Sequence, residues 1–312
     1  MSILARPTVA ALVARAMQAA TAVAGGRYAA ANLLNRYPEY PRRTLELTIP
    51  ASVAPARAVV YLPGSGETTP PVYVNFHGGG YVMAQTELDD PLCRCLAAEA
   101  GVAVVNVDYA VAPQHRFPAP PRQAYEVVRW VAEHGADHGW DGGRLVVGGQ
   151  SAGGALAAAV ARQALEESRP SIALQVLHYP PLDLATNARD KRSVTDRPML
   201  RPWMADVFDS SYVPDTGKRG DPLVSPAHPS DNADLTGIAP ALVITAEKDL
   251  LRSEGDRYAE RLRRVGSLVD HHVVPGADHG YDQNDAETAR DVYALIAQRV
   301  RQATDPGSAP SS

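Results

Sequence analysis

The chain has 312 residues, of which 45% are hydrophobic and 21% are charged, with a formal net charge of −5. This composition is ordinary for a globular protein with a sizeable core and argues against intrinsic disorder, while the length allows one large domain or two small ones. The arginines are scattered among acidic residues and leave no basic footprint for a phosphate backbone, so we expect no nucleic-acid partner.

The first predicted element is an amphipathic helix near the N-terminus. Its apolar residues recur at helical spacing: Val9, Leu12, Val13 and Met17. Arg15 and Gln18 interrupt the apolar stretch too early for a signal peptide, although Ala22-Val23-Ala24 resembles a cleavage site. We therefore expect the helix to pack on the body of a cytoplasmic protein. No run of about 18 apolar residues occurs, so no membrane span is predicted.

Strand-like segments, apolar and rich in β-branched residues, recur along the rest of the chain. There are eight of them: residues 44–49, 59–62, 72–76, 102–107, 145–148, 172–178, 241–246 and 269–274. Helical patterns lie between the later ones, at residues 121–133, 152–167 and 254–265. This alternation predicts an α/β fold, with a mostly parallel sheet that helices cover on both faces.

The residues that commonly bind metals do not form a recognisable pattern. Cys93 and Cys95 lie two positions apart in a helix-like stretch and point to different faces, so a disulfide between them is not expected and a reducing compartment fits. The pair His271-His272 lies in a predicted strand, where neighbouring side chains face opposite ways. We therefore predict no metal centre and no cofactor.

The segment Gly149-Gln150-Ser151-Ala152-Gly153 follows an apolar strand and opens an Ala-rich helical pattern. Glycines on both sides allow the backbone to turn sharply and to lift one hydroxyl above a sheet, as in a nucleophile elbow. Such a string also occurs by chance in Gly-rich loops, so its partners decide between the two interpretations. Ser151 is the candidate nucleophile.

A second Gly-rich segment, His77-Gly78-Gly79-Gly80, directly follows the predicted strand 72–76. Three consecutive glycines leave backbone N–H groups able to face an anion, which is what an oxyanion hole requires. We predict that Gly78 and Gly79 donate these N–H groups together with Ala152, the residue after the candidate nucleophile.

Two further residues complete a candidate triad. Asp249 lies in the loop after strand 241–246, and His279 lies in a Gly-bounded loop after strand 269–274. A serine needs a base to take its proton and an acid to orient that base, and His279 and Asp249 suit these roles, with Glu247 as the rival acid. The chain order Ser, Asp, His is that of α/β-hydrolases, and an HGGG loop before the elbow is typical of their lipases and esterases.

The chain resembles the bacterial hormone-sensitive-lipase-like esterases, the HGGG or family IV esterases of the α/β-hydrolase superfamily, over about residues 45–300. The triad positions carry this resemblance together with His77-Gly78-Gly79-Gly80-Tyr81, residues 108–119 (DYAVAPQHRFPA) and His279-Gly280. The resemblance implies an α/β-hydrolase fold with an eight-stranded, mostly parallel sheet, flanking helices and a helical cap.

The resemblance also divides the chain into segments. We expect N-terminal cap helices in residues 1–43, the hydrolase core in residues 44–184 and 221–304, and a cap insertion in residues 185–220. The insertion is a long connection without a strand, which favours a functional role. Candidate pocket residues are Tyr81, Trp203 and Phe208. The alternative is that such aromatic residues pack the cap on the core and do not contact the substrate. The tail, residues 305–312, has a composition typical of disorder.

Three positions depart from the family pattern. Gln150 precedes the nucleophile where the family usually has Asp or Thr, Gln114 replaces the Glu of a Pro-Glu-His segment, and Leu250 stands where the family tends to have Pro. None of the three is a triad position. They leave the substrate preference open.

The expected function is that of a serine carboxylic ester hydrolase, which cleaves short-to-medium-chain acyl esters through an acyl-enzyme. An amidase or arylacetamide deacetylase-like hydrolase would use the same machinery and is an alternative. A non-catalytic ligand-binding relative is another, because a fold alone does not establish catalysis. The expected partner is a small-molecule ester, and the resemblance also allows a homodimer formed through the edge of the sheet.

Overall fold

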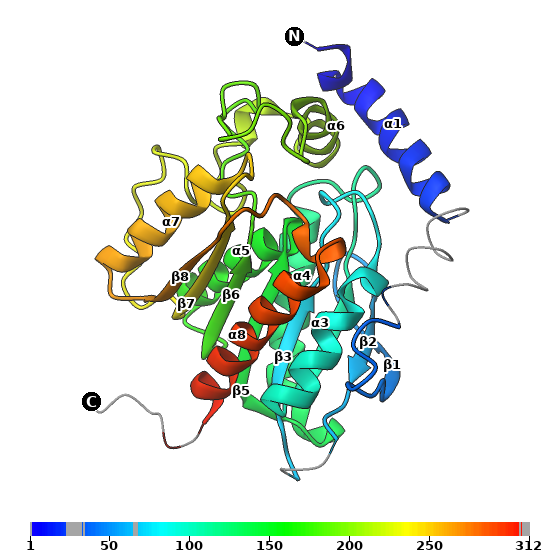
Figure 1. Cartoon of the computed structure of the whole chain (residues 1–312), viewed down its shortest axis with the longest axis vertical. Helices are drawn as coiled ribbons and strands as arrows, with labels where there is room; N and C mark the ends of the chain where they lie inside the picture. Colours follow the sequence, from blue (N-terminus) through cyan, green and yellow to red (C-terminus); the bar gives the residue numbers. More distant parts are fainter. Residues whose placement is uncertain (1, 23–32, 34, 65–67, 306, 308–312) are drawn as a thin grey trace.

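A sheet of eight strands runs through the centre of the molecule, for which the computed structural model describes residues 2–22, 33, 35–64, 68–305 and 307 (Figure 1). The strand order is β1-β2-β4-β3-β5-β6-β7-β8. Their bounds are β1 Thr44–Ile49, β2 Ala56–Tyr61, β3 Pro71–Phe76, β4 Ala103–Asp108, β5 Asp141–Gln150, β6 Leu174–His178, β7 Ala241–Ala246 and β8 Leu268–Val274. The pairs β1–β2 and β2–β4 are antiparallel and the other five pairs are parallel, so the predicted mostly parallel sheet is confirmed.

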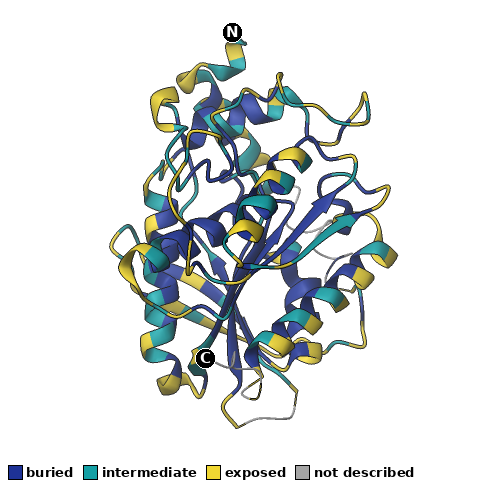
Figure 2. Cartoon of the chain, turned by 90° about the vertical axis from the view of Figure 1, so that its left-hand side faces the viewer, coloured by how far each residue is buried: buried dark blue, intermediate teal, exposed yellow. Residues whose placement is uncertain are grey.

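Helices cover both faces of this sheet, as expected for parallel strands that are apolar throughout. The helices α3 (Asp90–Cys95) and α8 (Ala286–Thr304) pack on one face, and α4 (Ala119–His134), α5 (Ala152–Glu167) and α7 (Arg252–Arg264) pack on the other. Strand side chains alternate between the two cores: Val72 and Val74 of β3 join the α4–α5 side, whereas Tyr73 joins the α3–α8 side. Figure 2 shows that the centre of the sheet is buried and that exposed residues of the helices lie on their outer surfaces, while the edge strands β1 and β8 are partly exposed.

Most predicted elements have the expected bounds to within a few residues, and two strands are longer. The strand β2 starts at Ala56 rather than at residue 59, because Arg57 interrupts the apolar run while the backbone continues its antiparallel ladder with β1. The strand β5 starts at Asp141, ahead of the apolar residues 145–148, and its first residue pairs with Pro71 of β3. A strand whose side chains alternate or lie near solvent gives no continuous apolar signal.

Two helices lie together above the carboxyl ends of the parallel strands. They are α1 (Pro7–Ala20), within the predicted N-terminal helix, and α6 (Pro202–Tyr212), within residues 185–220 (Figure 1). The Gln18 side-chain amide donates hydrogen bonds to the backbone oxygens of Val82 (2.7 Å) and Ala112 (3.0 Å), which fastens α1 to loops of the core. The predicted helical continuation over residues 23–32, and the predicted tail apart from residues 305 and 307, lie outside the described residues.

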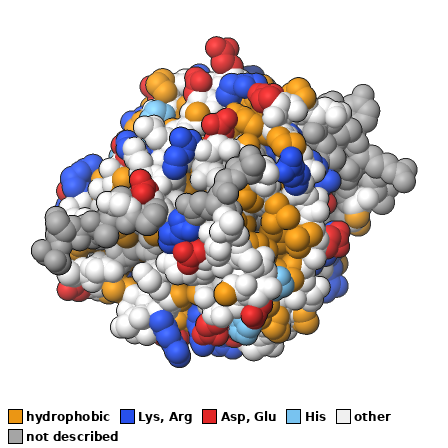
Figure 3. All heavy atoms as spheres, turned by 90° about the horizontal axis from the view of Figure 1, so that it is seen from below, with side chains coloured by type: hydrophobic (Ala, Val, Ile, Leu, Met, Phe, Trp, Pro, Cys, Tyr) orange, Lys and Arg blue, Asp and Glu red, His pale blue; other side chains and the backbone are white. Residues whose placement is uncertain are grey.

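Basic and acidic side chains are interspersed on the face that Figure 3 shows, which is the end away from α1 and α6. Over the described ranges, none of the helices combines the length and the apolar character that a bilayer crossing requires.

Candidate active site

The backbone turns sharply between β5 and α5, and Ser151 lies at the turn with φ 52° and ψ −122°. This strained conformation is held by close packing on β3. A Cβ atom at Gly153 would lie 1.8 Å from the Phe76 carbonyl oxygen, and one at Gly149 would lie 2.3 Å from the same atom. Both positions therefore require glycine, and the turn has the geometry that the sequence predicts for a nucleophile elbow.

The three candidate triad residues form one continuous hydrogen-bonded chain. Ser151 Oγ lies 2.9 Å from His279 Nε2, and His279 Nδ1 lies 2.7 Å from Asp249 Oδ2. The second carboxylate oxygen, Asp249 Oδ1, accepts the backbone N–H of Leu251 at 2.9 Å. This hydrogen bond fixes the carboxylate, and the carboxylate in turn orients the imidazole so that Nε2 faces the serine.

Two further carboxylates in the loops after β7 and β8, those of Glu247 and Asp278, have different partners. Glu247 Oε2 accepts the backbone N–H of Gly276 at 2.6 Å and so joins the loop after β7 to the loop after β8. Asp278 accepts the backbone N–H of Met199 at 2.7 Å, which ties the His279 loop to the region of α6. The structure therefore places Asp249, and neither Glu247 nor Asp278, against the imidazole ring.

The environment of His279 acts on its basicity in two opposing ways. Burial lowers the pKa of the imidazole, and the charge and hydrogen bond of Asp249 raise it, with a net rise above the usual value. Tyr179 covers the ring edge-on, with the ring centroids 4.8 Å apart. The imidazole is thus a stronger base than a free histidine while it remains shielded from bulk water.

The HGGG loop lies directly against the elbow. A Cβ atom at Gly78 would lie 3.7 Å from Ser151 Cβ, and Gly79 has φ 117°, a conformation that favours glycine. His77 Nδ1 contacts the Gly78 carbonyl oxygen at 2.6 Å, and Tyr109 stacks on His77 at 4.3 Å. Ala152 is the first residue of α5, where backbone N–H groups have no acceptor within the helix. Gly78 therefore lies beside Ser151 and Ala152 directly follows it, while the binding of an oxyanion by Gly78, Gly79 and Ala152 stays a prediction.

A cavity of about 220 Å³ opens onto Ser151 and His279. Tyr81 and Phe208, two of the predicted pocket residues, line it. Phe208 also packs so closely on Gly80 that a Cβ atom there would lie 2.6 Å from its ring. Trp203 is 46% exposed and does not line the cavity. Trp203 precedes Phe208 by five positions, and each position turns a helix by about 100°, so the two side chains are about 140° apart around α6. Trp203 therefore faces away from the cavity.

Sequence reasoning missed several cavity residues. Asp89 lies in the turn before α3, and Tyr179 directly follows β6. The others lie farther along the connection after β6 or on α6 and are Leu184, Ala188, Lys191 and Asp209. No short motif surrounds these residues. The helical spacing of Met204, Ala205, Phe208 and Asp209 along one face of α6 is the one signal that could have pointed to part of the group.

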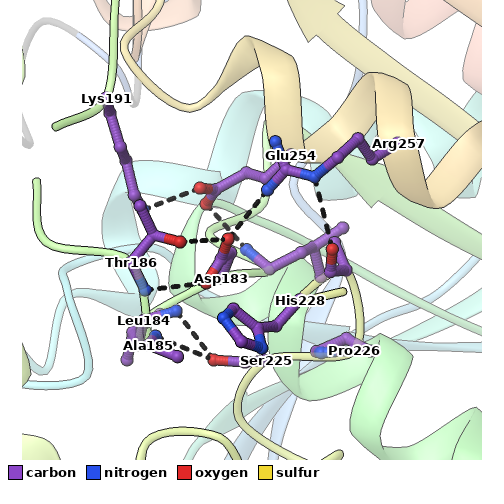
Figure 4. A network of polar contacts seen from close by, with 12 residues as sticks. Asp183, Leu184, Ala185, Thr186, Lys191, Ser225, Pro226, His228, Glu254 and Arg257 are labelled. Atoms are coloured by element: carbon purple, nitrogen blue, oxygen red, sulfur yellow. Dashed lines mark hydrogen bonds and ion pairs between the residues drawn. The ribbon is translucent and has the colours of Figure 1, made fainter. Parts of the chain in front are cut away.

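A buried polar network joins residues 183–191 to the hydrolase core (Figure 4). Asp183 accepts hydrogen bonds from Thr186 and forms an ion pair with Arg257 of α7 at 2.8 Å. Ser225 Oγ accepts the backbone N–H of Leu184 at 2.8 Å. Lys191 Nζ lies 2.7 Å from Glu254 Oε2, with both side chains almost completely buried. The segment that forms one wall of the cavity is therefore fixed to α7.

Two of the departures from the family pattern have specific partners. The Gln150 amide donates to Asp282 Oδ2, which also accepts the Tyr293 hydroxyl at 2.9 Å. Gln114 donates to Gln18 of α1 at 2.8 Å. The two glutamines therefore stabilise the surroundings of the site and leave the triad unchanged.

Known proteins that are similar to this chain in sequence or structure include esterases and an ethyl acetate hydrolase. Residues 73–283 match a protein family described as alpha/beta hydrolase fold. Esterase LipI of Mycobacterium tuberculosis is 35% identical over 251 residues, which cover 80% of this chain and 78% of that protein. An ethyl acetate hydrolase of Pseudomonas putida is 36% identical over 229 residues, 72% of this chain and 71% of that protein. A solved esterase structure from Pyrobaculum calidifontis has a TM-score of 0.81 at 34% identity and covers 95% of this chain and 94% of that one.

Proposed function

Because this chain belongs to the hormone-sensitive-lipase-like esterases of the α/β-hydrolase fold, we propose that it hydrolyses small carboxylic esters with Ser151, His279 and Asp249 as its triad. The observation that carries this proposal is the continuous chain of hydrogen bonds from Ser151 to His279 to Asp249, at the wall of a cavity. A serine hydroxyl is a weak nucleophile at neutral pH, and this chain supplies the base that it needs.

In the first half of the reaction, His279 Nε2 takes the proton of Ser151 while Oγ attacks the ester carbonyl carbon. The carbonyl oxygen becomes an oxyanion, and the N–H groups of Gly78, Gly79 and Ala152 donate to it. Each such donor lowers the barrier by about 3 kcal/mol. His279 then protonates the leaving alcohol oxygen as the bond from carbon to that oxygen breaks, which leaves an acyl-enzyme on Ser151.

In the second half, a water molecule takes the place of the alcohol. His279 accepts a proton from the water as its oxygen attacks the acyl carbon, and the same three N–H groups stabilise the second oxyanion. The imidazolium then returns its proton to Ser151 Oγ as the acid leaves. Asp249 stays ionised throughout and stabilises the charged imidazole.

The cavity supports a preference for small substrates. Its volume of about 220 Å³ is below the range of about 300–1,000 Å³ that is usual for ligand pockets, and most of its lining is apolar. We therefore propose short-to-medium acyl chains. The cytoplasmic location and the homodimer stay predictions from the sequence.

Hydrolysis of p-nitrophenyl esters from acetate to palmitate tests the proposal. Wild type is expected to prefer short or medium chains, and Ser151→Ala and His279→Ala each to lower kcat by about four orders of magnitude or more. Ser230→Ala and His138→Ala are matched controls, since both residues are exposed away from the site, and they should retain wild-type rates. Fluorophosphonate labelling should modify wild type and the controls, and spare the Ser151 variant.

Two results would contradict the proposal. If wild type hydrolyses no ester faster than Ser151→Ala does, the triad is inactive and a ligand-binding role takes precedence. If p-nitroacetanilide is hydrolysed faster than p-nitrophenyl acetate, the main activity is that of an amidase.

A further inference from the structure

Among the described residues, two acidic side chains line the otherwise mostly apolar cavity, Asp89 before α3 and Asp209 on the side of α6. Asp89 accepts a hydrogen bond from the Asn75 amide at 2.7 Å, and burial raises the pKa of its carboxyl, which favours the neutral form. Asp209 is surrounded by protein atoms but is only half-buried, because one side of it faces the cavity. Its carboxylate makes no hydrogen bond and no ion pair with any residue in the described part of the chain. A buried carboxylate without a partner is costly, and a ligand group of opposite charge would offset that cost.

The cations that face Asp209 are already engaged elsewhere. Lys191 forms its close ion pair with Glu254, and Figure 4 shows its side chain directed toward that carboxylate. The Arg219 guanidinium donates to Val213 O at 3.1 Å and to Ser210 Oγ at 3.0 Å. The acceptors of Arg219 are neutral, but Arg219 does not line the cavity, and the charges of Lys191 and Glu254 offset each other. The unpaired charge that lines the cavity on this side is therefore that of Asp209.

Asp209 carries this charge when its carboxyl group is deprotonated. Burial raises the pKa of its carboxyl to about 6, with Asp206 adding to the rise and with Lys191 and Arg219 opposing it. Glu254, from α7, is the acid that pairs with Lys191, and burial raises its pKa to about 7. At pH 8 both carboxylates are ionised, so Lys191 stays paired with Glu254 and Asp209 carries a negative charge at the cavity, which Arg219 does not line.

We propose that Asp209 makes this esterase selective for ester substrates that carry a positively charged group, which it binds in the cavity while the ester lies at Ser151. The proposal rests on the proposed function. Phe208, Tyr81 and Tyr179 line the same cavity, and aromatic faces bind quaternary ammonium groups well. In a cavity that excludes water, the carboxylate attracts a cation strongly and repels a second carboxylate, so the selectivity works in both directions.

Isosteric substrate pairs separate charge from size. The first pair, butyrylcholine and 3,3-dimethylbutyl butyrate, places a trimethylammonium or a tert-butyl group on the alcohol. The second pair places the same groups on the acyl part, as p-nitrophenyl 4-(trimethylammonio)butyrate and p-nitrophenyl 5,5-dimethylhexanoate. The readout is the ratio of kcat/KM within each pair at pH 8, measured by pH-stat or by nitrophenol release. Wild type should favour the cationic member of at least one pair by about tenfold.

Variants on α6 test whether Asp209 causes this preference. Asp209→Asn keeps the shape and removes the charge, so its ratio should fall to near one, whereas Asp209→Glu should retain part of the preference. Asp206→Asn is the matched control, because Asp206 lies on the same helix but bonds Arg189 at 2.9 Å and does not line the cavity. Its ratio should equal that of wild type even if its stability changes.

Three results would overturn the proposal. They are a wild-type ratio near one in both pairs, the same preference in Asp209→Asn as in wild type, and faster turnover of the p-nitrophenyl hemiester of glutaric acid than of p-nitrophenyl valerate, which would assign the cavity to Lys191. In each of them the neutral esters are still hydrolysed, so the proposed function stands. If wild type hydrolyses neither neutral nor charged esters, it is the proposed function that fails.

Discussion

Burial and the Asp249 carboxylate act in opposite directions on the pKa of His279, and the carboxylate prevails. Only neutral His279 can accept the serine proton, so activity should fall as the pH drops through its raised pKa. We expect the acid limb of kcat/KM against pH to have its midpoint above about 6.5, the ordinary value for histidine. Stopped-flow measurement with p-nitrophenyl acetate between pH 5 and pH 9 checks this, and a midpoint below 6 would show that burial prevails.

Asp249→Asn tests the role of the acid without changing its size. The amide cannot stabilise the imidazolium, and it can hold the wrong tautomer, so kcat should fall by about 10⁴. Its acid limb should also move to lower pH, since burial is then opposed only by the smaller effects of Asp282 and Asp278 on the pKa of His279. Glu247→Gln is the control: Glu247 binds Gly276 rather than the imidazole, and this variant should stay within a few-fold of wild type. The reverse ranking of the two variants would make Glu247 the acid.

At the scale of elements, the wall of the cavity depends on contacts between the connection from β6 to α6 and the helix α7. The ion pair of Lys191 and Glu254 is the most deeply buried of these contacts, with side chains 7% and 1% exposed. Taking two charges out of water is costly, and the pair is stable only while each charge has its partner. The same pair leaves Asp209 as the charge that faces the cavity.

Lys191→Met should therefore lower the free energy of unfolding by about 3–5 kcal/mol, because Glu254 remains buried without its partner. The double variant Lys191→Met/Glu254→Leu should recover most of this loss. The pKa of Glu254 is already raised to about 7 by burial, and losing Lys191 raises it further. Below that pKa the carboxyl is neutral in the folded state, so Lys191→Met should be more stable at pH 6 than at pH 8. Urea unfolding at both pH values measures this, and equal losses in the single and double variants would contradict it.

At the scale of the whole molecule, the sheet ends in two strands that each have one neighbour, β1 and β8. An edge strand presents unpaired backbone groups and can pair with a second copy of the chain, and a lysine on such a strand disfavours that pairing. Leu45 of β1 and Val269 of β8 are both exposed apolar residues on these edges.

If the chain is a homodimer through one edge, either Leu45→Lys or Val269→Lys should shift it to the monomer, while the other variant serves as the control. Both variants should keep the wild-type kcat, because neither residue lines the cavity. Light scattering coupled to size exclusion, across a hundredfold range of concentration, gives the mass. A wild-type protein that is monomeric at every concentration would contradict the predicted homodimer.

The features that could be predicted from the sequence are those written in contiguous residues. The glycines around Ser151 and after His77 stand in contiguous motifs, although the atom that most crowds Gly149 and Gly153 belongs to Phe76 of β3. The strand β7 and the helix α5 are continuous local patterns, so all of these features can be recognised in the sequence. The order of Ser151, Asp249 and His279 along an alternation of strands and helices was enough to predict that they meet, because parallel strands end at the same edge of a sheet. The described distances agree with that expectation.

What only the tertiary structure decided is how separate segments meet at the cavity. Asp209, Lys191 and Glu254 come from α6, a loop and α7, and no local pattern links them, since their interaction depends on burial and on distances across the fold. The rotation of α6 decided that Phe208 faces the cavity and Trp203 the solvent, although both are aromatic residues of one helix. Local sequence determines backbone conformation and motif chemistry, whereas the electrostatics and the lining of a cavity are set by packing between distant segments.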